Sequence, residues 1–293
     1  MRHFIVGTDW WTDCDDAVAM RLLARAAKRG EIAIDGIIIN ACMEDSVASL
    51  DGFLALEGVE NIPLGLDAAG TDFGGNPPYQ KRLAPFSKAH CKNEDAKDAV
   101  RLYRELLEKA KEPLEIIEIG YLQAFVALME SEADDISSKT GLELLREKAS
   151  KCWVMAGKWD KDGERENNFC RNPRARSAAE AFCRKCPVPV VFLGWEVGFD
   201  VISGSRLDPA DHLAKALSEH GSANGRSSWD PMLVLLALLG DAEMAGYALA
   251  NGKARVDEET GANYFEPLEN GPHAYVIKQR ENAFYADMID ARL

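Results

Sequence analysis

Four aspartates lie close together near the start of the chain, directly after a short apolar segment. Residues 8–17 read TDWWTDCDDA, and the acidic positions are Asp9, Asp13, Asp15 and Asp16. Carboxylates at this spacing repel one another strongly unless a cation or solvent separates them. Their hard oxygen atoms are the ligands that select Ca²⁺ or Mg²⁺ over softer metals. The cluster therefore predicts a metal site.

Helix capping, an EF-hand and a phosphatase motif each account for less of this pattern. Asp13 or Asp15 could cap a following helix, and acidic residues favour the first helical turn, but capping does not explain Asp9. An EF-hand would need a loop glycine and a distal glutamate, which do not follow at the required offsets. A phosphatase of the haloacid dehalogenase type would need a second aspartate two residues after Asp9, where Trp11 stands.

The elements that position these aspartates are predicted from hydrophobic periodicity. Short apolar runs alternate with stretches of helical period, which indicates βαβ units and a mostly parallel sheet flanked by helices. The predicted strands are Phe4–Thr8, Ala33–Ile39, Ile62–Leu66, Leu114–Ile119, Lys151–Met155 and Val188–Leu193. The predicted helices are Asp15–Arg29, Glu44–Glu57, Asp95–Lys111, Gln123–Ser131 and Pro173–Arg184. Ligands in such sheets bind beyond the carboxyl ends of the strands, where the aspartates lie.

The rest of the chain is consistent with one α/β domain over residues 1–293. The last hundred residues are expected to be more helical, with helices 210–219, 231–239 and 281–291 and short extended regions at 264–266 and 274–277. No internal repeat and no linker rich in Gly, Pro or Ser divides the sequence. The longest irregular stretch, 67–93, has the length of a functional loop.

Composition excludes several classes of protein. The net charge of −14 argues against nucleic acid and against an anionic membrane as partners. No apolar run reaches the roughly 18 residues of a membrane span. The first residues reach a charge too soon for a signal peptide. Seven cysteines, an odd and scattered set, fit reduced thiols in a cytoplasm, and Cys183 and Cys186 form a lone CxxC without a second pair.

The acidic segment resembles the hallmark of the inosine-uridine preferring nucleoside hydrolase family, a strand followed by Asp-x-Asp-Pro-Gly-x-Asp-Asp-Ala. The first aspartate and the Asp-Asp-Ala end are kept as Asp9, Asp15, Asp16 and Ala17. Trp11 replaces the family's second aspartate, and Thr12-Asp13 replaces Pro-Gly.

Three further segments match this family in order and span most of the chain. Residues 119–124, IGYLQA, are similar to the Thr-Gly-x-Leu-Thr-Asn turn, and 166–168, ENN, to the Glu-Phe-Asn segment. Residues 226–231, RSSWDP, are similar to the His-Asp-Pro segment. The resemblance implies a Rossmann-like nucleoside hydrolase architecture.

The resemblance also implies site residues and a cofactor. Ca²⁺ would be held by Asp9, Asp16, Asp230 and the backbone carbonyl of Ile119, with Asp13 an extra carboxylate of unassigned role. The ribose would be gripped by the side chains of Asp15, Asn40, Glu166, Asn168 and Asp230.

By the same resemblance, a calcium-bound water attacks the anomeric carbon and releases the base from the ribose. The favoured base of the family is lost to Trp11, so Asp9 is predicted in that role, with Asp13 as its rival. Trp229 stands where many members place a histidine acid, and purine-preferring members carry a tryptophan there that stacks on the base. Trp229 is therefore predicted to stack, with Trp11 or Phe73 as candidates for the other face.

The leading prediction is a ribonucleoside hydrolase with purine preference, acting on a small-molecule nucleoside or related riboside in the cytoplasm. The same fold and calcium site could serve another N-riboside, such as a nicotinamide riboside. A third possibility is a calcium-dependent ribose-binding protein without turnover, which the loss of the family's base supports. Members of the family are commonly homodimers or homotetramers, and the same is expected here.

Overall fold

A computed structural model describes residues 1–11 and 14–293, so Asp13 lies outside the described residues. The elements in chain order are β1 (Arg2–Thr8), α1 (Asp15–Lys28), β2 (Ile32–Ile39), α2 (Ser46–Glu57), β3 (Leu64–Leu66), α3 (Pro78–Leu83), η1 (Ala84–Phe86), η2 (Asn93–Asp95), β4 (Lys97–Asp98), α4 (Ala99–Lys109), β5 (Leu114–Ile119), α5 (Gln123–Met129), α6 (Gly141–Lys148), β6 (Ala149–Met155), β7 (Glu164–Arg165), α7 (Asn167–Cys170), α8 (Pro173–Lys185), β8 (Val190–Leu193), α9 (Trp195–Gly198), β9 (Ile202–Ser203), α10 (His212–Glu219), β10 (Arg226–Ser227), α11 (Trp229–Leu239), β11 (Tyr247–Val256), β12 (Ala262–Pro267), β13 (His273–Lys278) and α12 (Asn282–Asp290).

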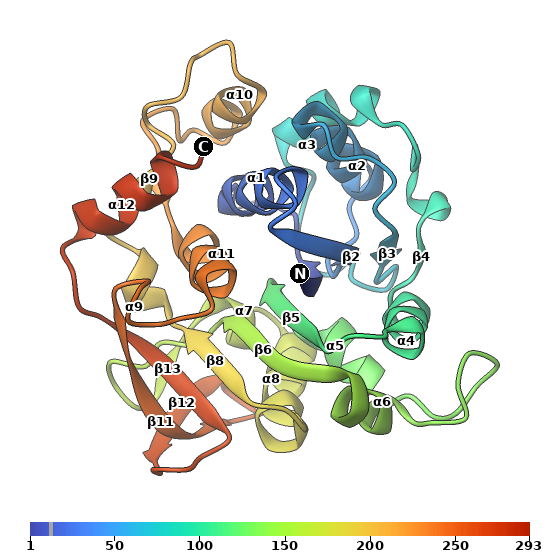
Figure 1. Cartoon of the computed structure of the whole chain (residues 1–293), viewed down its shortest axis with the longest axis vertical. Helices are drawn as coiled ribbons and strands as arrows, with labels where there is room; N and C mark the ends of the chain where they lie inside the picture. Colours follow the sequence, from blue (N-terminus) through green and yellow to red (C-terminus); the bar gives the residue numbers. More distant parts are fainter. Residues whose placement is uncertain (12–13) are drawn as a thin grey trace.

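One sheet runs through the molecule (Figure 1). In the described part of the chain its strand order is β4-β3-β2-β1-β5-β6-β8-β13-β11-β12-β7. Pairing is parallel from β4 to β13 and antiparallel across β13, β11, β12 and β7. A short second sheet joins β9 to β10. The predicted α/β fold with a mostly parallel sheet flanked by helices is confirmed.

Alternating side chains of the central strands fill two separate cores. In β1, Phe4 and Val6 pack on the side covered by α1, α2 and α11, whereas Ile5 faces α4, α5 and α8. Ile37 and Ile38 of β2 divide in the same way. Because both faces of each strand are buried, these strands are apolar throughout, which is typical of parallel sheets. The arrangement fixes the carboxyl end of β1 in the middle of the sheet.

The predicted elements match the structure in position, but the periodicity misses several others. Helix α6, strand β11 and the short helices α3, α7 and α9 are not predicted from it. In the C-terminal region, β12 and β13 lie at the predicted extended regions 264–266 and 274–277, whereas β11 is not predicted. In β11 the buried and exposed positions alternate only from Gly252 onward, and the turn-favouring pair Asn251-Gly252 lies within the strand, so the periodic signal is weak.

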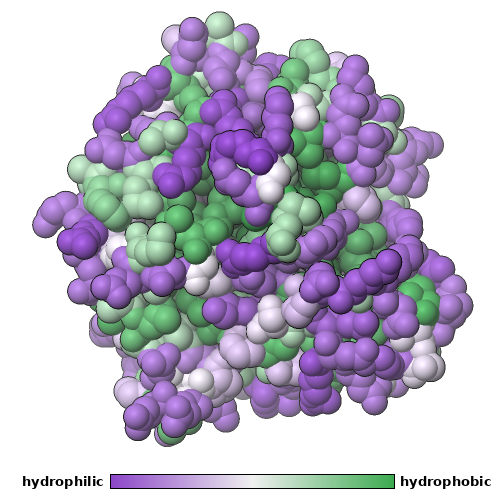
Figure 2. All heavy atoms as spheres, viewed as in Figure 1, coloured by the Kyte–Doolittle hydropathy of each residue, from purple (hydrophilic) through white to green (hydrophobic). Residues whose placement is uncertain are grey.

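The surface in Figure 2 is mostly hydrophilic, as the high content of charged residues leads one to expect. On the face shown in Figure 2, hydrophilic side chains cover most of the surface and hydrophobic ones form separate patches between them. In the described part of the chain, no helix has both the length and the hydropathy needed to cross a bilayer.

Candidate metal and ribose site

A cavity lies at the carboxyl edge of the parallel strands. It is lined by residues at or just after the ends of β1, β5, β6 and β8 and by residues at the starts of α1, α7 and α11. The described lining residues are Asp9, Asp15, Asp16, Ile119, Met155, Glu166, Asn167, Asn168, Trp195, Trp229 and Asp230. This is the place at which open parallel sheets bind ligands. Eight of the predicted site residues are brought together here.

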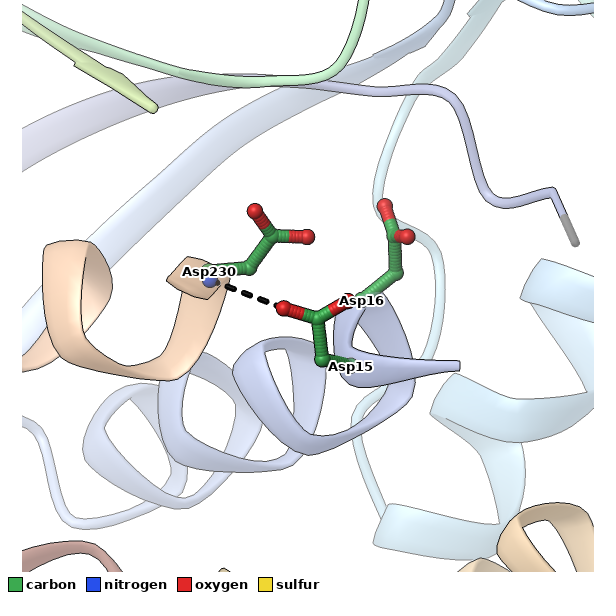
Figure 3. Close-up of side chains that lie close together, drawn as sticks. All are labelled: Asp15, Asp16 and Asp230. Atoms are coloured by element: carbon green, nitrogen blue, oxygen red, sulfur yellow. Dashed lines mark hydrogen bonds between the residues drawn. The ribbon is translucent and has the colours of Figure 1, made fainter. Parts of the chain in front are cut away.

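Three of the aspartates converge in this cavity. Asp15 and Asp16 begin α1, and Asp230 lies in the first turn of α11. One carboxylate oxygen of each lies within 4.8 Å of the other two, and the residues are 3%, 1% and 4% exposed (Figure 3). The helix starts are also tied together, because the Asp230 backbone N–H donates to Asp15 Oδ2 at 3.0 Å.

The donor set fits a hard divalent cation. Three buried carboxylates this close repel one another, and a cation between them offsets both the repulsion and the cost of burying charge. Carboxylate oxygens together with a backbone carbonyl are ligands typical of Ca²⁺. The predicted ligands Asp9 and Ile119 line the same cavity, whereas Asp15, which is predicted to bind the ribose, lies within the acidic trio itself.

Local N-capping, in which an aspartate caps the helix that follows it, does not explain the acidic cluster among the described residues. The N-cap of α1 is Cys14 and the N-cap of α11 is Ser228, and neither makes a capping side-chain hydrogen bond. Asp230, which the Asp-Pro pattern presents as an N-cap, instead lies inside the first turn. The Thr8 hydroxyl and the Trp10 backbone N–H, the latter at 3.3 Å, both donate to Asp16 Oδ1 and orient that carboxylate.

Asp9 is held by a strained turn directly after β1. Trp10 has a φ of 46°, which is rare for a residue with a side chain. Its buried indole packs on Phe53 and Tyr79 and donates to Ser49 Oγ at 2.8 Å, so the core retains this conformation. The turn lets the next backbone N–H, that of Trp11, donate to Asp9 Oδ1 at 3.2 Å. Strain supported in this way is typical of functional sites.

Asn40 is not among the described residues that line the cavity. It is buried at the end of β2, where its Oδ1 accepts from the Tyr121 N–H at 3.1 Å and its Nδ2 has no hydrogen-bond partner. Gln123 stands at the position of the second threonine in the Thr-Gly-x-Leu-Thr-Asn turn. Its side-chain amide donates a hydrogen bond to the Asn40 carbonyl. The predicted contact between Asn40 and the ribose stays a prediction.

Glu166 and Asn168 are fixed by backbone groups. Glu166 is the N-cap of α7; its Oε1 accepts from Asn168 N at 2.9 Å and its Oε2 from Gly157 N at 3.0 Å. Burial raises the pKa of Glu166 to about 7, although these hydrogen bonds oppose the shift. Asn168 donates to the Met155 carbonyl at 2.9 Å. Both side chains are thus preorganised at the cavity wall.

Trp229 forms part of the wall through its ring rather than its N–H. The indole Nε1 donates to the Trp195 carbonyl at 2.7 Å, and the Arg226 guanidinium lies 5.2 Å from the ring centroid. Trp195, Met155 and Asn167 also line the cavity, although sequence reasoning does not assign them. For Met155 and Trp195, the position at or just after a predicted strand end is a usable signal, because the carboxyl edge of a parallel sheet is where ligands bind.

Trp11 and Phe73 belong to a different cluster. Trp11 packs with Phe73, Tyr121 and neighbouring apolar residues, and its Nε1 donates to Gly75 O at 3.0 Å. Arg171 lies 4.8 Å over the Trp11 ring and donates to Phe73 O at 2.8 Å. Neither aromatic residue is among the described residues that line the cavity, so the idea that one of them stacks on the base finds no support.

The two cysteines of the CxxC lie at the end of α8. Cys183 is buried, Cys186 is partly buried, and both are free thiols. Burial raises the pKa of Cys183. Among the described residues, the one group of acidic, histidine or cysteine side chains arranged to hold a metal is the aspartate trio.

Comparison with known proteins connects this fold to solved structures. An inosine-uridine preferring nucleoside hydrolase from Bacillus anthracis is 12% identical, with full coverage of both chains and a TM-score of 0.67. The plant nucleoside hydrolase PpNRh1 is 14% identical over 99% of this chain and 98% of its own, with a TM-score of 0.69. The type III effector XopQ, solved with adenosine diphosphate ribose, is 14% identical over 99% and 93%, with a TM-score of 0.68.

These likenesses rest on structure. The sequence matched neither a family model nor a curated protein. The chain therefore has the fold of the nucleoside hydrolases, as the resemblance predicted, and the neighbours with that fold include both hydrolases and an effector.

Proposed function

We propose that the protein hydrolyses the N-glycosidic bond of ribonucleosides, with a preference for purines, and that it uses Ca²⁺. The observation that carries this proposal is the convergence of Asp15, Asp16 and Asp230 in one cavity with Asp9, Glu166 and Asn168. This arrangement combines a cluster of hard anionic ligands with polar side chains that can bind hydroxyl groups.

The calcium ion would be held by Asp9, Asp16, Asp230 and the carbonyl of Ile119. When bound, the ion would lower the pKa of a water molecule and orient the ribose hydroxyl groups. Asp15 remains the proposed ribose ligand, although its carboxylate also lies within the trio.

The ribose would be gripped by carboxylates and amides on two sides. Asp15 and Asp230 face it from the two helix starts, and Glu166 and Asn168 face it from α7. Hydrogen bonds to ribose hydroxyls hold the sugar in place, and the surrounding negative charge favours the positive charge that develops on the ring as the base departs.

Hydrolysis requires water to attack the anomeric carbon while the bond to the base nitrogen breaks. Asp9 is proposed to accept the proton that the water loses, since its carboxylate is fixed by the Trp11 N–H at the cavity wall. Asp13 is the alternative acceptor. The departing base nitrogen takes a proton from solvent.

Trp229 is proposed to stack on the base. Its indole N–H is already bound to the Trp195 carbonyl, so the side chain would contribute through its ring face. Stacking raises the basicity of the leaving ring and so makes protonation by solvent easier. Trp229→Ala is expected to reduce purine release sharply.

The decisive experiment measures reducing sugar released from adenosine, inosine, uridine and nicotinamide riboside, with calcium and with chelator. The purine nucleosides are expected to yield ribose only with calcium. Asp16→Asn should abolish the signal, while Asp208→Asn, at an exposed position outside the cavity, should retain it. Absence of ribose from all four compounds in saturating calcium would reject the hydrolase proposal, and release from nicotinamide riboside alone would move it to another N-riboside.

A second candidate is calcium-dependent binding of a ribosyl ligand without turnover. It is favoured by Trp11, whose aromatic side chain replaces the family's base and packs in a separate cluster. The structure of XopQ with adenosine diphosphate ribose provides a neighbour with a bound ribosyl ligand. Calorimetry with adenosine or adenosine diphosphate ribose, run beside the ribose assay, distinguishes the two: binding without ribose release supports this candidate.

A further inference from the structure

Trp195 lies two residues after the end of β8 and begins the short helix α9. Its side chain lines the cavity next to Trp229. The two ring centroids are 6.3 Å apart with an interplanar angle of 30°. Phe199 stacks on Trp195 with a centroid distance of 4.4 Å and an angle of 27°, and lies 6.4 Å from Trp229. These three residues are termed the aromatic wall.

The exposure of the three side chains in the aromatic wall increases from Trp229 through Trp195 to Phe199. Trp229 is 9% exposed, Trp195 is partly buried, and Phe199 is 46% exposed. The wall therefore runs from the interior of the cavity to the surface. Phe199 covers one face of Trp195, so the ring presents to the cavity the part that Phe199 leaves uncovered.

Backbone hydrogen bonds fix the wall in place. The Trp195 N–H donates to Gly157 O at 2.8 Å, and the Trp195 carbonyl accepts from Trp229 Nε1 at 2.7 Å. Gly198 packs directly against Trp229, since a Cβ at position 198 would stand 2.6 Å from the Trp229 Cα and Cδ1. A rigid aromatic surface of this kind binds a planar ligand at low entropic cost.

We infer that Trp195 is a specificity-determining residue for the leaving group, and that the wall selects ribosides whose base is a fused two-ring aromatic. This rests on the proposed function. Aromatic rings attract one another at centroid separations of roughly 4.5–7 Å. Only 9% of Trp229 is exposed, so a fused base that stacks on it would place its second ring against the neighbouring Trp195. A single-ring base gains little from Trp195.

The test compares Trp195→Ala, Trp195→Phe and Phe199→Ala with the wild type. Adenosine supplies two fused rings and uridine one. Both kcat/KM and equilibrium binding by calorimetry are measured, and thermal melting reports folding. Phe86→Ala serves as matched control, because Phe86 is also 46% exposed and lies outside the wall.

Trp195→Ala is expected to weaken adenosine binding and kcat/KM by about 5- to 100-fold, the range typical of base stacking, with uridine changed less than about twofold. Trp195→Phe should restore most of the adenosine affinity, and Phe86→Ala should match the wild type. Equal losses for both nucleosides, or none for adenosine, would overturn the inference.

The binding measurement separates this inference from the proposed hydrolysis. If neither nucleoside is cleaved, the hydrolase proposal fails, but a selective loss of adenosine binding in Trp195→Ala still supports the wall as a base subsite. Unchanged adenosine binding in that variant, or no adenosine binding by the wild type in calcium, contradicts the inference whatever the turnover.

Discussion

The backbone N–H of Asp230 donates to the carboxylate of Asp15 at 3.0 Å, across 215 positions of the sequence. This bond joins the first turn of α11 to the first turn of α1 and places both residues within the aspartate trio (Figure 3). Asp15 thus has a structural task, as acceptor for a buried backbone donor, in addition to its place in the cavity.

Different substitutions at Asp15 separate these two tasks. Asp15→Ala leaves the Asp230 N–H without this acceptor, which is expected to cost about 1–3 kcal/mol in the free energy of unfolding. Asp15→Asn retains a carbonyl oxygen and should unfold close to the wild type while losing activity. Urea denaturation together with the ribose assay measures both effects. Equal stability of the alanine and asparagine variants would show that the bond contributes little.

Calcium should stabilise the folded protein through the trio. A ligand that binds only the native state at 100 times its dissociation constant adds about 2.7 kcal/mol. We expect a rise in the melting temperature with calcium that Asp230→Asn reduces strongly, since it removes one buried anionic ligand. Asp208→Asn provides the control. A calcium-induced shift of wild-type size in Asp230→Asn would place the ion elsewhere.

Glu118 makes the stability of the protein depend on pH. The residue is buried in β5, Tyr103 donates to its Oε1 at 2.5 Å, and its Oε2 has no hydrogen-bond partner. Burial raises the pKa of Glu118 to about 8, against the opposing effect of Tyr103. The folded state therefore prefers the protonated form, and this contribution is complete below the ordinary pKa of 4.5 and is lost as the pH rises through about 8.

Glu118→Gln should remove this dependence. Between about pH 5 and 8 the wild type should lose stability relative to the variant, by an amount on the order of several kcal/mol at the upper end. Chemical denaturation at a series of pH values in chelator measures the difference. The exposed Glu31→Gln substitution is the control. Parallel pH profiles for wild type and Glu118→Gln would show that the pKa of Glu118 is not raised in the folded protein.

Trp11 contacts the segment after β3 at Gly74 and Gly75 and helps to hold it in place. Its indole N–H donates to Gly75 O at 3.0 Å, and Gly74, with a φ of 145°, packs against the ring. Trp11→Phe removes the hydrogen bond, at an expected cost of about 1 kcal/mol, and should increase proteolytic cleavage within residues 71–77. Limited proteolysis followed by mass spectrometry locates the cuts. Unchanged cleavage there would show that other contacts hold the segment.

The fold and the acidic part of the site are predictable from the sequence, for a common reason. The apolar runs of β1, β2 and β5 identify buried parallel strands, and the end of such a strand locates Asp9 and Ile119 at one edge of the sheet. Asp15 and Asp16 follow at the start of α1. Asp230 requires the family resemblance, because its sequence context shows only a helix start.

The aromatic part of the site is harder to predict, because it depends on tertiary packing. The resemblance predicts that Trp229 stacks on the base. The hydrogen bond from its indole N–H to the Trp195 carbonyl joins residues 34 positions apart and cannot be predicted from the sequence. Trp195 follows a predicted strand, but nothing in its sequence context shows that its ring lies beside Trp229. Trp11 is a candidate for stacking on the base by sequence alone, and only its packing with Phe73 and Tyr121 shows that its ring lies elsewhere.

The aspartate trio has a consequence for how the protein is made. Two of its carboxylates are synthesised with the first helix, but the third arrives at residue 230 of 293, on a helix that packs against α1. A ribosome producing this chain must therefore complete more than three quarters of it before all three are present. If the trio binds calcium as proposed, the ion can act through all three carboxylates only late in synthesis and not as an early nucleus for folding.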